Sequence, residues 1–328
     1  MCATLATSAT AFQLDSPYLD VIRRGMELTI TDHYDDACVL FDSLISEDST
    51  DHAAYLFLAG VYHAEMTDRE DYADIHLFHD SIEKAIRLAR KAIKENNNPA
   101  WAYLTCGNAH GYVAAYEGKN GSWFAALKQG IKAKNCYLKA LAQDSTLYDA
   151  YLGLGTYHYW KSAKTEFINW LPFVKDRKQQ GLYELQLAVD SSLFSGDMAI
   201  SSLIWIHLHR GDPISAMRLS QALRARYPHS RLAIWGLAFS SLYSGKLHAA
   251  ADCFGELIEA VADDPEQNYF NLIECRWHRG VIFRRVGQRQ KALEELDLLL
   301  NYPLSDDVAK RQQEKINKAR KLKDELEL

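Results

Sequence analysis

The sequence predicts an all-α solenoid of about seven stacked helical hairpins, and three observations lead to this prediction. Small residues recur along the 328-residue chain, first at intervals of 48 residues and later at 35, 34 and 42. They are Ala37, Ala85, Ala133, Gly181, Ala216, Ala250 and Ala292, and each is followed four and seven positions later by further apolar or small residues. Only 7 prolines and 17 glycines interrupt the chain, and valine and isoleucine are sparse beside alanine and leucine, which favours helix over strand. Such self-similarity is typical of supersecondary units that bury their apolar faces only by stacking.

Each recurring small residue is assigned to the second helix of a hairpin, and a matching position lies in the first helix. That position is filled by Gly25 in the first hairpin and by Gly280 in the last. Turn glycines follow in register in the last three hairpins, as Gly211, Gly245 and Gly287. This spacing resembles the tetratricopeptide repeat, whose pattern W-x2-L-G-x2-Y, A-x3-F-x2-A and P spans about 34 residues. The resemblance covers roughly residues 18–303 and implies a right-handed superhelix over residues 16–304.

The second to fourth hairpins, within residues 52–196, each carry 14 extra residues at the turn. Their first-helix and second-helix positions are 26 residues apart instead of 12, at Ala59 and Ala85, Gly107 and Ala133, and Gly155 and Gly181. Seven residues added to each helix correspond to about two turns, or roughly 10 Å. We therefore expect both helices of these three hairpins to be longer than those of their neighbours. Ser122, after the turn Gly-Lys-Asn-Gly, is an expected helix N-cap.

The insert of the fourth hairpin differs from the other two because it is aromatic and contains Pro172, which interrupts a helix. Its apolar side chains are Phe167, Ile168, Trp170, Leu171, Phe173 and Val174. We expect them to form a lid over Tyr112, Tyr159 and Trp160; the alternative is an exposed patch for a partner or a membrane surface. The stretch FVKDRKQQGLYEL locally resembles a segment of the mitochondrial-associated tetratricopeptide family of inclusion-body clearance. That resemblance covers about 20 residues with a different spacing, and no function is carried over from it.

The two ends of the chain lie outside the repeats. Residues 305–328 are expected to form a capping helix that begins at the N-cap Ser305. Its apolar stripe comprises Val308, Gln312, Ile316, Ala319, Leu322 and Leu326. Residues 1–15 are expected to be either a disordered N-terminus or the remnant of a signal peptide, because MCATLATSATAF is uncharged and ends near an A-x-A pattern. A signal remnant in residues 1–11 implies an exported or periplasmic protein, and otherwise the protein is expected to be cytoplasmic.

A binding surface is predicted on the first helices, which line the concave side of the tetratricopeptide superhelix that the chain resembles. Five of the seven tryptophans stand at inward positions counted from the first-helix small residue. Aromatic rings suit binding surfaces because they combine a large apolar area with a polar edge. The predicted ligand-binding residues are Trp101, Asn108, Tyr112, Tyr159, Trp160, Trp205, His209, Trp235, Phe239, Tyr243 and Trp277, on a wall that also includes Thr156, Arg284 and Arg285. The alternative is that the tryptophans only pack between helices.

Several chemistries are not supported by the sequence. The net charge of −6 offers no basic surface for nucleic acid. No phosphate-binding loop, HExxH motif or nucleophile elbow occurs, so we expect neither an enzyme nor a cofactor. His76 and His79 could share one helix face beside Asp80, but a third ligand is not apparent nearby, so no metal is expected. Asn108 matches one position of a carboxylate clamp for acidic tails, but the lysines of that clamp are absent.

The sequence therefore predicts a non-catalytic protein- or peptide-binding scaffold with an aromatic concave groove. The alternative is a binder of a small apolar ligand or lipid in a pocket under the extended central hairpins, walled by residues 111–124 and 159–177. We expect a protein or peptide partner, no nucleic acid and no transmembrane segment, because no run of 18 apolar residues occurs.

Overall fold

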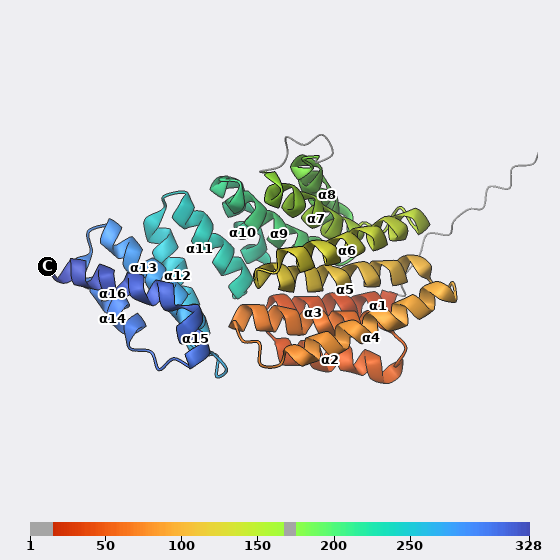
Figure 1. Cartoon of the computed structure of the whole chain (residues 1–328), viewed down its shortest axis with the longest axis horizontal. Coiled ribbons are helices and arrows are strands. Elements are labelled where there is room, and N and C mark those ends of the chain that lie inside the picture. Colours follow the sequence, from red (N-terminus) through yellow and green to blue (C-terminus); the bar gives the residue numbers. More distant parts are fainter. Residues whose placement is uncertain (1–15, 167–174) are drawn as a thin grey trace, which may run out of the picture. The chain divides into compact units, whose positions relative to one another are not determined.

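The computed structural model describes residues 16–166 and 175–328, and this part of the chain contains sixteen helices and no strand. Consecutive helices pair into seven hairpins, which Figure 1 shows in chain order. The pairs are α1 (Ser16–Ile30) with α2 (Tyr34–Glu47), α3 (His52–Arg69) with α4 (Ile75–Lys94), α5 (Pro99–Lys119) with α6 (Trp123–Gln143), α7 (Ala150–Lys164) with α8 (Lys178–Ser191), α9 (Gly196–His209) with α10 (Pro213–Arg226), α11 (Arg231–Tyr243) with α12 (Leu247–Ala262), and α13 (Phe270–Arg285) with α14 (Arg289–Leu300). The predicted all-α fold of helical hairpins is confirmed.

The recurring small residues lie where the two helices of each hairpin touch, and all seven are buried. The two backbones approach closely in the fourth hairpin, where a Cβ atom on Gly155 would lie 2.7 Å from the carbonyl oxygen of Gly181. Backbone atoms there cannot move aside as a side chain can, so a larger residue must push α7 and α8 apart. The spacing of small residues in the sequence thus records the contacts between paired helices.

Left-handed glycines end the first helices of the last three hairpins. Gly211, Gly245 and Gly287 have φ angles of 76°, 79° and 76°. This conformation carries no steric cost for glycine, and it lets the next N–H group bond back to the last helical turn. Such a bond joins the Asp212 N–H to the carbonyl oxygen of His207 over 2.9 Å. The turn glycines found in the sequence therefore have a defined structural role.

The helices of the second and third hairpins are long, with 18 and 20 residues in α3 and α4 and 21 in each of α5 and α6. The expectation of long helices in the fourth hairpin is wrong, because α7 has 15 residues and α8 has 14. In the last turn of α7 the Ser162 hydroxyl accepts the backbone N–H of Arg177 over 2.9 Å, just before α8 begins. Pro172, which a helix interior does not accommodate, stands in the sequence between them. Residues 167–174, with the apolar cluster predicted to form a lid, lie outside the described residues, as do residues 1–15.

The C-terminal cap consists of two helices, α15 (Asp306–Arg311) and α16 (Gln313–Glu327), instead of the single helix expected. They meet at Gln312, whose buried side-chain amide donates to the Glu274 carboxylate on α13 over 3.0 Å. The Ser305 hydroxyl accepts the N–H of Val308, as an N-cap does. Apolar residues of the cap pack against α13 and α14; they are Val308, Ile316, Ala319 and Leu322. The break is therefore fixed by a buried polar side chain, which apolar periodicity does not predict.

The chain divides into two compact units, each of which is described by itself. Of the described residues, unit 1 comprises residues 16–29, 33–63, 75–166 and 175–202. Unit 2 comprises residues 30–32, 64–74 and 203–328. Unit 2 thus brings together three stretches that are far apart in the sequence.

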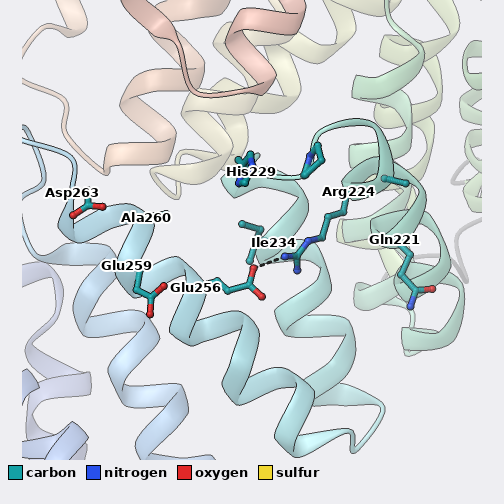
Figure 2. Close-up of a pocket in the computed structure, with 10 residues that line it drawn as sticks. Gln221, Arg224, His229, Ile234, Glu256, Glu259, Ala260 and Asp263 are labelled. Carbon is teal, nitrogen blue, oxygen red and sulfur yellow. Dashed lines mark hydrogen bonds and ion pairs between the residues drawn. The ribbon is translucent and has the colours of Figure 1, made fainter.

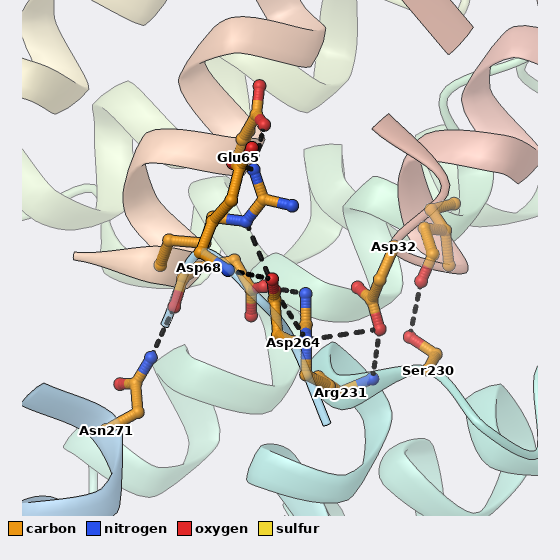
Figure 3. A network of polar contacts seen from close by, with 10 residues as sticks. Asp32, Glu65, Asp68, Ser230, Arg231, Asp264 and Asn271 are labelled. Atoms are coloured by element: carbon orange, nitrogen blue, oxygen red, sulfur yellow. Dashed lines mark hydrogen bonds and ion pairs between the residues drawn. The ribbon is translucent and has the colours of Figure 1, made fainter. Parts of the chain in front are cut away.

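An ion-pair network around Arg231 joins the three stretches of unit 2, as Figure 3 shows. The nearly buried guanidinium group of Arg231, at the start of α11, lies 3.5 Å from Asp32, 2.5 Å from Asp68 and 3.2 Å from Asp264. Arg69, at the end of α3, forms a second ion pair with Asp264 at 3.2 Å. Asp264 therefore lies between two guanidinium groups, those of Arg69 and Arg231, that are far apart in the sequence.

Backbone contacts strengthen the same network. The Arg231 N–H donates to the Asp32 carboxylate over 2.9 Å, and the Ser230 hydroxyl donates to the carbonyl oxygen of Ile30 over 2.6 Å. Burial alone would raise the pKa of Asp264, but the N–H of Glu266 and the positive charge of the two arginines outweigh burial and lower that pKa. The carboxylate is accordingly ionised in the folded protein at neutral pH.

Candidate functional site

Unit 2 contains an aromatic cluster on its first helices. We use the name aromatic cluster for six side chains: Trp205 on α9, Trp235, Phe239 and Tyr243 on α11, Phe254 on α12 and His278 on α13. Four of them are among the residues predicted to bind a ligand. The structure therefore brings together Trp205, Trp235, Phe239 and Tyr243 in one unit.

Phe239 is the centre of the aromatic cluster. Its ring stacks on Trp235 and on Tyr243, with centroid distances of 5.8 and 6.0 Å. It meets Trp205 and His278 edge to face at 5.9 and 5.2 Å. These are preferred arrangements of aromatic pairs, and each contributes about 0.5–1.5 kcal/mol beyond simple burial. Rings from three consecutive first helices are thus fixed in one continuous set.

The aromatic cluster has a buried base and an exposed rim. Phe254 is fully buried beneath it, whereas Trp205 and Tyr243 keep 37% and 61% of their surface exposed. Large aromatic groups that remain exposed on a rigid base are typical of binding surfaces. The base already holds the rings in place. A ligand that covers the rim therefore binds with little further loss of side-chain conformational entropy in these rings.

His278 stacks on Phe254 at a centroid distance of 5.0 Å. Burial lowers the pKa of His278 to about 4, although the nearby Glu274 carboxylate opposes this shift. The ordinary histidine pKa is 6.5, so the unfolded state binds more protons than the folded state between these two values. The neutral imidazole therefore stabilises the fold above pH 6.5, and this contribution is lost as the pH falls toward 4.

We expect acidification from pH 7 to pH 5 to lower the free energy of unfolding of unit 2 by about 2 kcal/mol through His278. The measurement is urea unfolding at both pH values for the wild type and for His278→Phe, which keeps an aromatic ring but has no titratable group. The variant should lose less stability on acidification by about that amount. Equal losses in the two proteins would show that His278 is not the responsible group.

The other predicted residues of unit 2 are His209 on α9 and Trp277 on α13. His209 is exposed at the end of α9. Trp277 is half-buried and packs against the apolar cluster formed by Ile273, Leu296 and the C-terminal cap. Trp277 is thus in contact with the core of the last hairpin, an interaction that the inward register alone does not reveal.

In unit 1 the chain itself covers the predicted surface at Trp101. Only 6% of Trp101 is exposed, because Phe194 packs on its ring edge to face at 5.9 Å. Phe194 also packs on Phe57, at 5.4 Å. Phe194 belongs to the loop between α8 and α9, which the repeat pattern does not describe. Trp101 therefore lies in an aromatic core and presents almost no surface to a ligand.

A buried carboxylate anchors this covering loop. Asp149, at the N-terminus of α7, accepts the backbone N–H groups of Leu193, Phe194 and Ser195 over 2.9, 3.1 and 3.0 Å. Only 1% of Asp149 is exposed. Three consecutive N–H groups on one buried carboxylate fix the loop backbone and hence the position of the Phe194 ring.

The remaining predicted residues of unit 1 are also in contact with neighbouring side chains. The Asn108 side-chain oxygen accepts a hydrogen bond from the Tyr137 hydroxyl over 3.0 Å. Burial raises the pKa of Tyr112 to about 12, and its ring lies 5.3 Å from that of His63. Tyr159 is buried, with the half-buried Trp160 edge-on to it at 5.3 Å. The structure does not gather these residues into an exposed aromatic set like that of unit 2.

A pocket in unit 2 was missed by the sequence analysis. It has a volume of about 540 Å³ and lies beside α10 and α12, the second helices of two adjacent hairpins. Figure 2 shows its lining, which comprises Gln221, Arg224, Ala225, Pro228, His229, Ile234, Glu256, Glu259, Ala260 and Asp263. Arg224 forms an ion pair with Glu256 across it. The available signal was the spacing of Glu256 and Glu259 on α12 and of Asp263 at its C-cap.

The described residues hold no group of three or more histidine, cysteine or acidic side chains arranged to bind a metal ion. The described cysteines are free thiols: Cys38, Cys106, Cys136, Cys253 and Cys275. In the same part of the chain, none of the helices combines the length and hydropathy needed to span a bilayer.

Comparison with known proteins identifies the type of fold. No protein-family model matches the chain, and no curated protein is similar to it in sequence. It is similar to a chain in the crystal structure of the APC/C hetero-tetramer Cut9–Hcn1, with a TM-score of 0.56 and 11% identity over 88% of this chain and 47% of that chain. It thus spans about half the length of that chain. It is also similar to PilW, described as a widely conserved type IV pilus biogenesis factor, with a TM-score of 0.48 and 15% identity over 75% of this chain and 96% of that one.

Both of these are tetratricopeptide-repeat proteins. At such low identity the likeness to the first shows the fold alone, and that fold is a tetratricopeptide-like helical repeat. The predicted fold class is confirmed, and the function must be argued from the surface itself.

Proposed function

We propose that this protein is a non-catalytic scaffold in which the aromatic cluster of unit 2 binds a peptide or an extended segment of a partner protein. The observation that supports the proposal most strongly is the exposed rim of Trp205 and Tyr243 on a buried aromatic base. Tryptophan and tyrosine are the residues most often found at the energetic centre of protein interfaces. Helical-repeat scaffolds present such residues in series, because each hairpin contributes one helix to the same surface.

A peptide fits this surface better than a small apolar ligand does. The rim residues lie on two successive first helices, α9 and α11, and both are substantially exposed. A small apolar ligand is normally enclosed on most sides, which requires a concave apolar pocket. The pocket in Figure 2 has several charged side chains in its lining, among them Arg224 and Glu256, and contains none of the residues from 111–124 or 159–177. These observations favour a peptide or protein partner.

The test uses peptides selected for binding to the full chain from a phage-displayed library. We expect the selected peptides to bind the Trp205→Ala/Tyr243→Ala variant at least about tenfold more weakly, since one hot-spot side chain contributes about 2 kcal/mol or more. The melting temperature should fall by only a few degrees, because the variant also loses the ring contacts of Trp205 and Tyr243 with Phe239 but leaves the buried base intact. The measurement is isothermal titration calorimetry of the selected peptides against both proteins.

The matched control is Ile214→Ala, which removes an equally exposed apolar side chain from α10, a second helix. The control should bind as the wild type does. Selected peptides that bind the wild type, the double variant and the control with equal affinity would contradict the proposal. A co-purifying lipid retained by the wild type, in the absence of any selected peptide, would support the alternative of a small apolar ligand.

A further inference from the structure

Helix α6 of unit 1 has a charge of one sign only. Its 21 residues include Lys128, Lys132, Lys134 and Lys139, and no aspartate or glutamate. Residues 99–164, which form α5 to α7 and their connections, contain seven lysines and three carboxylates, although the whole chain has a net charge of −6. One of the three carboxylates, Asp149, is buried beneath the loop that it anchors. The surface around α6 is therefore a basic region on an acidic protein.

An exposed apolar stripe runs along the same helix. Phe124, Leu127, Ile131 and Leu138 are spaced three, four and seven residues apart, which places them on one helical face. All four are exposed, and Phe124 keeps 93% of its surface accessible. A side chain of this size leaves so much apolar surface in water only at a cost in free energy, which a partner that covers it would remove. The opposite face, with Ala133, Tyr137 and Ala140, is buried against the hairpin.

Lysines border the apolar stripe. Lys128, Lys132 and Lys139 follow the stripe on one side, at spacings of four and seven residues, and all three are exposed. In the described part of the chain, Lys128 and Lys132 take part in no ion pair. At the start of the helix the half-exposed Trp123 carries the Lys164 ammonium group over its ring at 4.0 Å. Apolar side chains flanked by lysine and by an interfacial tryptophan are typical of helices that lie flat in a lipid headgroup region.

The corresponding helix of the preceding hairpin shows how different α6 is. The exposed face of α4 carries both signs of charge, with Glu83 beside Lys84 and Arg87. Such a mixed face is well hydrated and needs no partner. Helix α6 has neither the compensating carboxylates nor the polar face, although both helices are the second helices of long hairpins.

We propose that the exposed face of α6 binds the surface of an anionic lipid bilayer, with the stripe of Phe124, Leu127, Ile131 and Leu138 inserted and the flanking lysines at the lipid phosphates. Charge complementarity favours a bilayer, because a continuous negative surface neutralises lysines along the whole helix. The apolar stripe supplies the second contribution that stable peripheral binding requires. This site lies in unit 1 and does not depend on the aromatic cluster of unit 2.

The test is flotation of the full chain with vesicles of phosphatidylcholine alone and with vesicles that also contain phosphatidylserine. We expect binding to the anionic vesicles only, and release at high salt. In Lys128→Gln/Lys132→Gln the partition coefficient should fall about 25-fold, since each lysine near an anionic surface contributes about fivefold. In Phe124→Ser/Ile131→Ser it should fall at least about tenfold. The controls Lys91→Gln/Lys94→Gln and Leu77→Ser, all on α4, should bind as the wild type does.

Circular dichroism melting of each variant separates loss of binding from loss of folding, and these surface changes should leave the melting temperature nearly unchanged. Trp205→Ala/Tyr243→Ala should float like the wild type, so vesicle binding and peptide binding can fail independently. The proposal is overturned if the wild type does not bind anionic vesicles or if the α6 variants bind as well as the α4 controls. It is equally overturned if sedimentation shows that the α6 face instead holds two copies of the chain together.

Discussion

Replacement of Arg231 by alanine is expected to lower the free energy of unfolding of unit 2 by about 3–5 kcal/mol. The guanidinium group is nearly buried and faces Asp32, Asp68 and Asp264. Removal of the cation leaves three carboxylates close together, of which Asp264 still has its ion pair with Arg69. A buried pair that loses one partner is strongly destabilised because the remaining charge has lost both its hydration and its counter-charge. Urea unfolding followed by tryptophan fluorescence measures the effect.

The exposed ion pair between Lys318 and Glu314 provides the control, and Lys318→Ala should cost less than about 1 kcal/mol. The pH dependence gives a second test. The lowered pKa of Asp264 stabilises the wild type above the ordinary carboxyl pKa of 3.8, and this contribution is lost as the pH falls through the lower folded-state value. In Arg231→Ala the crowded carboxylates take up protons more readily, so the difference in stability between variant and wild type should shrink toward pH 4. A difference that stays constant with pH would contradict the electrostatic explanation.

Replacement of Asp149 by alanine is expected to lower the free energy of unfolding of unit 1 by about 3–5 kcal/mol. The variant leaves the N–H groups of Leu193, Phe194 and Ser195 without their shared acceptor. Each N–H group left unsatisfied in the interior costs about 1–3 kcal/mol, although some of them gain water when the loop opens. Movement of the loop also withdraws Phe194 from Trp101, so acrylamide should quench more of the tryptophan fluorescence in the variant.

The control is Asp190→Ala, because Asp190 is an exposed residue of α8 that bonds to the Gln186 side chain. It should change stability by less than about 1 kcal/mol and leave quenching unaltered. A stable Asp149→Ala protein with wild-type quenching would show that the loop is held by the packing of Phe194 alone.

The repeat architecture could be predicted because most hairpins obey the same local rules. Paired helices touch at small residues such as Ala250, and a first helix commonly ends at a left-handed residue such as Gly245. These residue types therefore predict the helix contact and the turn. The aromatic cluster of unit 2 followed from the same register, since Trp205 and Phe239 occupy the same inward position in successive hairpins and Tyr243 lies one helical turn further along α11.

The departures come from single residues that act over long sequence distances. Phe194 lies in a loop outside the repeat pattern, yet it packs against Trp101 and closes the surface there. The contact between Arg231 and Asp32 joins residues 199 positions apart, and no sequence motif predicts that these two residues are partners. Gln312, which ends α15, is a polar residue in an otherwise apolar stripe. Its hydrogen bond to Glu274 is likewise a contact that the stripe does not predict. Periodicity describes neighbouring helices and contains no information about such distant contacts.

The central claim, that the aromatic cluster of unit 2 receives a peptide, is tested most directly by photo-cross-linking. A selected peptide that carries a photoreactive phenylalanine analogue at its essential apolar position is bound to the full chain, irradiated and mapped by mass spectrometry. The account predicts cross-links to α9, α11 and α13, near Trp205, Phe239 and Tyr243. Cross-links confined to α10 and α12, around the pocket in Figure 2, would contradict it.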